Sequence, residues 1–260
     1  MRSSSHNSES LFLNKVPEVT LIFWAIKILS TTVGETAADL LSIRLDLGLS
    51  LTSFVMGAVF LIALFFQLRA RRYQAPIYWA TVVLISIVGT LVSDNLVDGM
   101  GISLITTSVA FGLILTAVFA TWYASERTLS IHTIVTRRRE LFYWAAILFT
   151  FAMGTSVGDL LAESLDLGYG QALLVFAAMI FLVAILHYVA RMDAILSFWL
   201  AYILTRPLGA SLGDLLAKPM LAGGLGWGTV TTSIVFLAVI LVAVAYLAIS
   251  KPDEIALDQT

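Results

Sequence analysis

The sequence contains no cysteine and little charge. The lack of cysteine excludes disulfides, thiol nucleophiles and the thiolate ligands of zinc, copper and iron–sulfur sites. Charged residues make up 12% of the 260 positions and hydrophobic residues 59%. A soluble domain has about 25% charged and about 45–50% apolar residues. This composition is typical of a protein embedded in a lipid bilayer.

Basic residues and histidines are scarce too. The formal net charge of −2 provides no basic surface for nucleic acid. The three histidines (His6, His132 and His187) are too scattered for a histidine-rich metal site. The polar first 16 residues lack a cleavage site after a short apolar core, so we expect no cleaved signal peptide. We expect no cofactor.

Long hydrophobic runs dominate the chain instead. A hydrocarbon core about 30 Å thick requires about 20 apolar residues per helix. Eight stretches qualify: 18–42, 51–70, 75–97, 103–124, 141–163, 170–190, 195–217 and 228–249. They predict an all-α integral membrane protein with eight transmembrane helices. Its expected parts are an N-terminal tail (1–17), a four-helix half (18–124), a linker (125–140), a second four-helix half (141–249) and a C-terminal tail (250–260).

Lysine and arginine are unequally divided between the two sets of connections. One set, which includes both termini, holds eleven: Arg2, Lys15, Arg69, Arg71, Arg72, Arg127, Arg137, Arg138, Arg139, Arg191 and Lys251. The other holds Arg44 and Lys218. Cytoplasmic loops of membrane proteins are enriched in these residues. Both termini are therefore predicted to be cytoplasmic.

A four-fold internal repeat runs through the spans. An aspartate follows a tryptophan by 15 residues in each unit, and a glycine precedes that aspartate by five. The tryptophans are Trp24, Trp79, Trp144 and Trp199; the glycines are Gly34, Gly89, Gly154 and Gly209; the aspartates are Asp39, Asp94, Asp159 and Asp214. Trp24 and Trp144 are 120 residues apart, as are Trp79 and Trp199, which indicates a duplicated four-helix half.

Each unit contributes two helices, so every unit enters the membrane from the same side and the repeats are parallel. Fifteen residues of helix rise about 22 Å at about 1.5 Å per residue. The tryptophans are thus expected near the cytoplasmic interface, where indole is favoured. The four aspartates are expected at one shared depth in the outer part of the bilayer.

Small residues form a seam beside each aspartate. The pairs four residues apart are Gly34 and Ala38, Gly89 and Ser93, Gly154 and Gly158, and Gly209 and Gly213. Such small-xxx-small pairs allow two helix backbones to approach closely in lipid. They predict that the four odd-numbered helices pack against one another.

A polar stripe accompanies this seam. Residues four before the aspartates include Glu35, Thr90 and Thr155, and those three before include Thr36, Ser156 and Ser211. The five carboxylates (Glu35, Asp39, Asp94, Asp159 and Asp214) face only two bases within the spans, Lys27 and Arg206. Oxygen ligands suit hard cations such as Mg²⁺, Ca²⁺ and Mn²⁺, or protons. We predict an ion site here, with Glu35, Asp39 and Asp159 as the leading metal ligands.

Plainer interpretations remain open. The aspartates lie near helix ends, where water or loop amides can satisfy them, although a carboxylate there opposes the helix dipole. Lys27 is expected to extend its ammonium to the cytoplasmic interface. Arg206 lies near mid-membrane, where a structural salt bridge to one of the acids is its expected role as internal counter-charge.

The phased residues resemble those of a bacterial family of multi-pass membrane proteins defined by a repeat of unknown function. The resemblance covers about residues 18–249 and rests on the Trp/Gly/Asp sets from Trp24 to Asp214. It implies a bacterial inner membrane and offers no activity.

The residues favour a secondary transporter or exporter of a hard cation, with the lipid bilayer and a small cation or other small solute as its partners. A cation channel with an aspartate ring and a non-transporting scaffold or sensor are the alternatives. An enzyme is not expected, because the sequence has no histidine-containing nucleophilic constellation and no phosphate-binding loop.

Overall fold

The computed structural model describes residues 14–250, which form eight long helices and no strands. The helices are α1 (Leu21–Asp39), α2 (Gly48–Arg69), α3 (Ala75–Asp94), α4 (Leu104–Glu126), α5 (Arg137–Asp159), α6 (Gly168–Tyr188), α7 (Ala194–Ala217) and α8 (Thr229–Ser250). All eight are long and apolar enough to cross a membrane. The prediction of an all-α, eight-helix, multi-pass membrane protein is confirmed. The predicted tails lie mostly outside the described residues.

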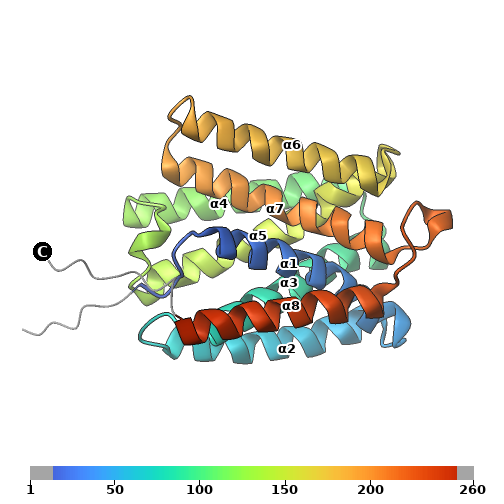
Figure 1. The fold of residues 1–260 in the computed structure, drawn as a ribbon, viewed down its shortest axis with the longest axis horizontal. Coiled ribbons are helices and arrows are strands. Elements are labelled where there is room, and N and C mark those ends of the chain that lie inside the picture. The colour runs from blue at the N-terminus through green and yellow to red at the C-terminus, as the bar shows by residue number, and fades with distance from the viewer. Residues whose placement is uncertain (1–13, 251–260) are drawn as a thin grey trace, which may run out of the picture.

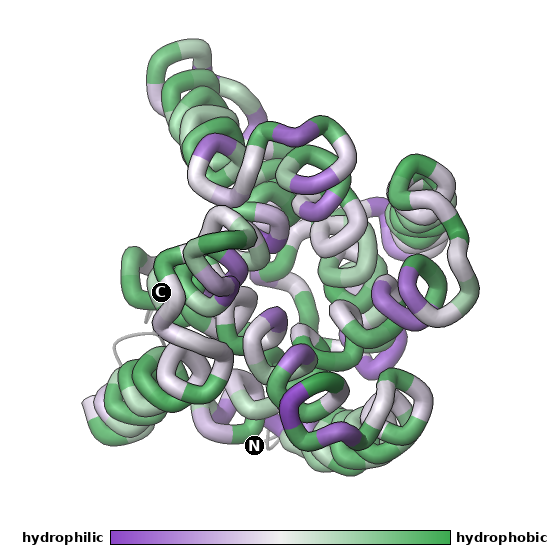
Figure 2. Tube along the Cα trace, turned by 90° about the vertical axis from the view of Figure 1, so that its right-hand side faces the viewer, coloured by the Kyte–Doolittle hydropathy of each residue, from purple (hydrophilic) through white to green (hydrophobic). Residues whose placement is uncertain are grey.

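The odd-numbered helices form an inner bundle and the even-numbered helices surround it (Figures 1 and 2). Around the inner bundle α1 contacts α3, α3 contacts α5, α5 contacts α7, and α7 contacts α1. Each outer helix lies on the next inner helix along the chain: α2 on α3, α4 on α5 and α6 on α7, and α8 returns to α1. The two halves therefore close a single ring rather than forming separate units.

Burial differs sharply between the two sets of helices. In the inner helices 50% to 61% of the most apolar stretch is buried, against 11% to 28% in the outer helices. An outer helix is apolar on all sides yet largely exposed, which suits a helix that faces lipid. The polar residues of the spans are concentrated on the inner helices, where other protein covers them.

The two ends of the bundle have different chemistry. The four repeated tryptophans lie toward the end where the described chain both begins and finishes, at the left in Figure 1; we name this the tryptophan end. The repeated aspartates terminate or nearly terminate the inner helices at the opposite, aspartate end, which faces the viewer in Figure 2. A π-helical turn of five residues follows Asp39, Asp94 and Asp159, whereas α7 continues past Asp214 to Ala217.

The four repeated glycines lie at the contacts between neighbouring inner helices. Each receives the side chain eight positions before the aspartate of the next inner helix. The pairs are Gly34 with Ser86, Gly89 with Phe151, Gly154 with Arg206, and Gly209 with Thr31. A Cβ atom on any of these glycines would collide with its partner. Close approach of backbones, as the small-xxx-small pattern predicts, therefore sets the spacing of the whole ring.

The second glycines of units three and four lie at the same contacts. A Cβ on Gly213 would meet α1, 3.3 Å from the Cβ of Glu35, and one on Gly158 would meet α7, 3.6 Å from the Cα of Pro207. These two contacts are looser than those of the repeated glycines.

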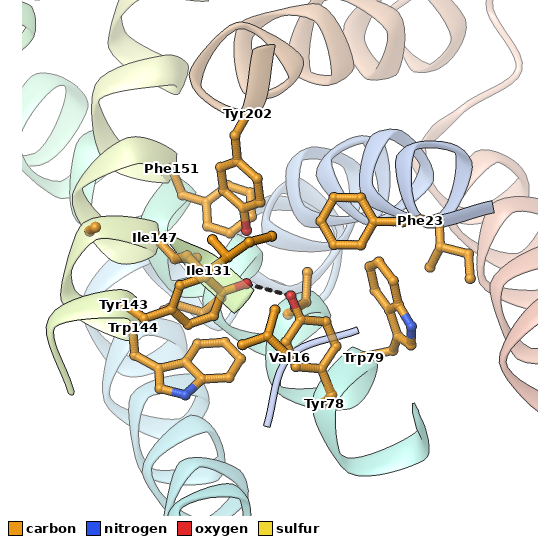
Figure 3. Packing of buried hydrophobic residues seen from close by; sticks show 14 of the residues in the cluster. Val16, Phe23, Tyr78, Trp79, Ile131, Tyr143, Trp144, Ile147, Phe151 and Tyr202 are labelled. Carbon is orange, nitrogen blue, oxygen red and sulfur yellow. Dashed lines mark hydrogen bonds between the residues drawn. The ribbon is translucent and has the colours of Figure 1, made fainter. Parts of the chain in front are cut away.

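Aromatic side chains close the tryptophan end of the inner bundle. The hydroxyls of Tyr78 and Tyr143 are 2.5 Å apart, and Tyr202 points its hydroxyl toward them (Figure 3). Val16, from the segment before α1, and Ile131, from the connection between α4 and α5, cover this cluster. We name Tyr78, Tyr143 and Tyr202 the tyrosine cluster.

Candidate functional site

Arg206 lies at the centre of the inner bundle and is 0% exposed. Its guanidinium donates to the carbonyl of Thr31 at 2.7 Å and pairs with the Glu35 carboxylate at 2.9 Å, both on α1. It also donates to the hydroxyls of Thr90 on α3 and Thr155 on α5. One side chain of α7 thus joins all three other inner helices, so the axis of the bundle is occupied at this level.

The acceptors around Arg206 are supplied by the repeat itself. Glu35, Thr90 and Thr155 each precede the aspartate of their unit by four residues, so the predicted polar stripe converges on the axis. The hydroxyls of Thr90 and Thr155 donate to carbonyls one turn earlier, which leaves their lone pairs for the guanidinium. The expected salt bridge of Arg206 to an acid is present, with Glu35 as its partner.

The other predicted hydroxyl residues lie between helices. Thr36 shares a 2.7 Å hydrogen bond with Ser233 of α8, and Ser156 shares one of 2.8 Å with Ser93 of α3. Ser211 is buried, and its hydroxyl has no hydrogen-bond partner among residues 14–250. Thr36 and Ser156 therefore join helices.

Lys218 links two of the four aspartates. It follows α7 directly, and its Nζ lies 3.2 Å from Asp39 and 3.6 Å from Asp214. Burial by itself lowers the pKa of Lys218, but the carboxylates of Asp214, Asp39 and Glu35 outweigh it and hold this pKa above its usual value. The α1–α7 side of the aspartate end thus carries its own cation.

Asp94 and Asp159 are in a different situation. Both are partly buried, and within the described chain neither carboxylate has a hydrogen bond or an ion pair. Each interacts electrostatically with Glu35, and the two interact with each other. The α3–α5 side of the aspartate end therefore holds two carboxylates that protein cations leave unpaired.

The predicted metal ligands are not gathered into one centre. Across residues 14–250 no three aspartate, glutamate, histidine or cysteine side chains form a group able to hold a metal ion. The reason is the basic partners: Glu35 turns inward to Arg206, and Asp39 turns to Lys218, while Asp159 has neither. Glu35, Asp39 and Asp159 thus have different surroundings and do not form one metal site.

Sequence reasoning missed three charged residues at the aspartate end. Asp98, Glu163 and Lys218 each follow the repeated aspartate of their unit by four residues. Asp98 interacts electrostatically with both of the others, and Glu163 accepts a hydrogen bond from Tyr169 at 2.9 Å. The four-residue spacing, one helical turn beyond the aspartate, is the signal that could have found them.

The prediction that Lys27 extends its ammonium to the cytoplasmic interface is wrong. Lys27 is 0% exposed, and its Nζ lies inside the inner bundle, 4.0 Å from the centroid of the Phe151 ring and 4.2 Å from that of Tyr202. It precedes Glu35 by eight residues, so both share the inner face of α1. The rotation of α1 about its own axis therefore points the ammonium away from the membrane interface.

Comparison with known proteins agrees with the four-fold repeat. A family described as "Repeat of Unknown Function (DUF347)" matches residues 22–73, 77–128, 142–193 and 197–252. The chain belongs to this family. Each match spans one inner and one outer helix, so the repeat of the family is the two-helix unit seen in the structure. No curated protein and no solved structure matches the chain.

Proposed function

We propose that this protein is a membrane transporter that moves a small cation, by secondary transport or export, through the inner bundle. The observation that carries the proposal is the pair of unpaired carboxylates, Asp94 and Asp159, on adjacent inner helices at one end of a polar core. Acidic residues within membrane spans are costly and commonly mark ion or proton pathways.

Charge balance supports a cationic solute. Arg206 offsets Glu35, and Lys218 offsets one charge of the Asp39 and Asp214 pair. The carboxylates of Asp94 and Asp159 form no ion pair within the described chain, although Arg206 attracts Asp94 from a distance, so a bound cation or protons would stabilise them. Because no group of three acids forms among the described residues, a proton or a weakly coordinated cation fits this state better than a divalent metal with three protein carboxylates.

The filled axis of the inner bundle fits a carrier better than it fits an open channel. Arg206 fills the centre, and the tyrosine cluster with Val16 and Ile131 closes the tryptophan end. A pore with an aspartate ring would need a continuous wet path along this axis. Transport would therefore require a second conformation in which the Arg206 contacts are exchanged for others.

The orientation belongs to the same proposal. Among the described residues, nine lysines and arginines at the tryptophan end against two at the other end favour a cytoplasmic tryptophan end and two cytoplasmic termini. The family membership and this charge bias favour the inner membrane of a bacterium. The unpaired carboxylates would then face the outside of the cell.

The test is flux in reconstituted liposomes. Purified protein is assayed with radiolabelled Mn²⁺, Ca²⁺ and Rb⁺, while a trapped pH-sensitive dye reports protons. We expect flux of a cation or of protons with the unaltered protein and a loss of at least tenfold in the double variant Asp94→Asn/Asp159→Asn. The matched control is Asp166→Asn, at an exposed position with a left-handed backbone (φ 54°) that asparagine also adopts.

The outcomes separate the competing functions. Flux that is unchanged in the double variant, or the absence of any flux with well-folded protein, contradicts the proposal. Unitary conductance steps in planar bilayers would indicate a channel instead. Normal assembly of the unaltered protein without flux, together with altered assembly of the double variant, would favour the scaffold.

A further inference from the structure

Lys27 is a buried basic residue of the inner bundle that, unlike Arg206, has no polar partner in the described part of the chain. Its Nζ has no hydrogen-bond acceptor among residues 14–250 and forms no ion pair there. The ring faces of Phe151 and Tyr202 lie against it, with centroids 4.0 Å and 4.2 Å from Nζ. Buried ions in proteins are otherwise paired or hydrogen-bonded, so Lys27 is an exception with a cost.

Arg206 is a like charge close enough to Lys27 to repel it. α8, which also packs on α1, carries one titratable side chain, Tyr246, and it is exposed. Two titratable groups act on Lys27 directly, and both are on α7: Tyr202 and Arg206. Tyr202 in turn interacts with Tyr78 on α3 and Tyr143 on α5, while Glu35 lies further along the inner face of α1.

The position of Lys27 along the bundle is intermediate. Glu35 lies on its aspartate-end side, two helical turns or about 12 Å of backbone rise further along α1. The Arg206 guanidinium is nearer, because it and the Lys27 ammonium lie 5.6 Å and 4.0 Å from the centroid of the same Phe151 ring.

Tyr78 and Tyr143 directly precede the tryptophans of their units, whereas Lys27 follows its own by three residues, so these two tyrosines lie on its tryptophan-end side. Tyr202 lies at the level of Lys27, with its ring 4.2 Å from the ammonium. A proton that crosses the inner bundle between the unpaired aspartates and the tryptophan end must therefore pass the level of Lys27.

The chemistry of the side chain suits such a passage. A lysine amine has one lone pair that accepts a proton, and burial makes its charge state responsive to neighbouring charges. No carboxylate of the described chain fixes the ammonium form of Lys27, whereas Arg206 is held by Glu35. Tyrosine hydroxyls both donate and accept hydrogen bonds, so the cluster beyond Lys27 can receive a proton through its oxygens.

We propose that Lys27 is the proton-binding residue that couples cation transport to a proton gradient. The amine lone pair forms an N–H bond with a proton that arrives from the aspartate end. An N–H bond of the resulting ammonium breaks when a proton leaves toward the tyrosine cluster, so each cycle restores the free amine. This inference rests on the proposed transport function.

The first experiment separates coupling from transport in liposomes, with whichever of Mn²⁺, Ca²⁺ and Rb⁺ the unaltered protein moves. Lys27→Met keeps an unbranched side chain without the amine. We expect it to retain exchange of labelled for unlabelled cation but to lose, by at least tenfold, uphill accumulation driven by a pH gradient. The matched control, Ile147→Met, alters the equivalent buried position on α5 and should keep both activities. Uphill accumulation at the unaltered rate in Lys27→Met overturns the inference.

The second experiment needs no solute and distinguishes this inference from the proposed function. Protein labelled with ¹⁵N at the lysine amines is followed by NMR in detergent, and the Lys27 signal is assigned by its absence in Lys27→Met. We expect the Nζ signal to move with pH over the range in which transport or folding is maintained. A signal that stays constant over that range overturns the inference, even where flux is observed. A titrating Lys27 in a protein without flux would instead contradict the proposed function, and with it the coupling, while supporting proton binding by Lys27.

Discussion

Gly209→Ala tests whether glycine contacts set the spacing of the inner bundle. A Cβ on Gly209 would lie 2.6 Å from the Cβ of Thr31 and 3.2 Å from the carbonyl oxygen of Ile28, both on α1. Thr31 has no room to yield, because it is 0% exposed and its hydroxyl donates to Ile28 at 2.6 Å. Backbone of α1 or α7 must therefore shift.

The size of the effect follows from two opposing contributions. Replacing glycine by alanine within a helix stabilises it by at most about 1 kcal/mol. Forcing an extra carbon into a packed contact costs about 1–3 kcal/mol. At Gly57 of α2 an added methyl group would have no neighbouring atom within 4 Å, so only the first contribution applies there. We expect Gly209→Ala to be about 2–3 kcal/mol less stable than Gly57→Ala.

The assay is the free energy of unfolding, from denaturant titration in detergent micelles. Gly158→Ala provides an intermediate point, because its nearest neighbour lies at an ordinary 3.6 Å. The expected order of stability is Gly57→Ala, then Gly158→Ala, then Gly209→Ala. Equal stabilities of Gly209→Ala and Gly57→Ala would refute the argument that the repeated glycines fix the helix spacing.

Two further predictions concern Arg206 and Lys218. Glu35→Gln removes the single ion partner that Arg206 has in the described chain, so the free energy of unfolding should fall by about 3–5 kcal/mol. The double variant Glu35→Gln/Arg206→Met should recover part of this loss. A loss of stability in the double variant alone would contradict the prediction. Because the folded pKa of Lys218 is raised, its contribution to stability is complete below the unfolded value of 10.5 and is lost as the pH rises through the folded pKa. Titration of stability above about pH 10.5 should therefore show a decline in the unaltered protein that is smaller in Lys218→Met.

Much of the architecture could be predicted from the spacing of a few residues along the sequence. The constant spacing of Trp24 to Asp39 in all four units identifies the repeat, and the length of the apolar runs gives eight helices. The small residues beside each aspartate indicate which helices meet. These features are local, because helix periodicity alone places residues four or eight apart on one face.

The partners of the charged residues could not be predicted in the same way. The sequence places Lys218 in a loop, yet it reaches Asp39, which is 179 residues away in the sequence. Lys27, predicted at the interface, is enclosed by Phe151 and Tyr202. The contacts of Lys218 and Lys27 could not be predicted for the same reason. The rotation of each helix about its axis depends on its neighbours, and no single span contains that information.

The sequence by itself determined the helices, the parallel repeat and the polar stripe, since each depends on spacing within one span. Only the tertiary structure decided which acids are neutralised. The cyclic order of the inner helices places Arg206 against Glu35 and Lys218 between Asp39 and Asp214, and within the described chain it leaves Asp94 and Asp159 unpaired. The four aspartates are equivalent in the repeat, but one base on α7 and another directly after it make their surroundings unequal.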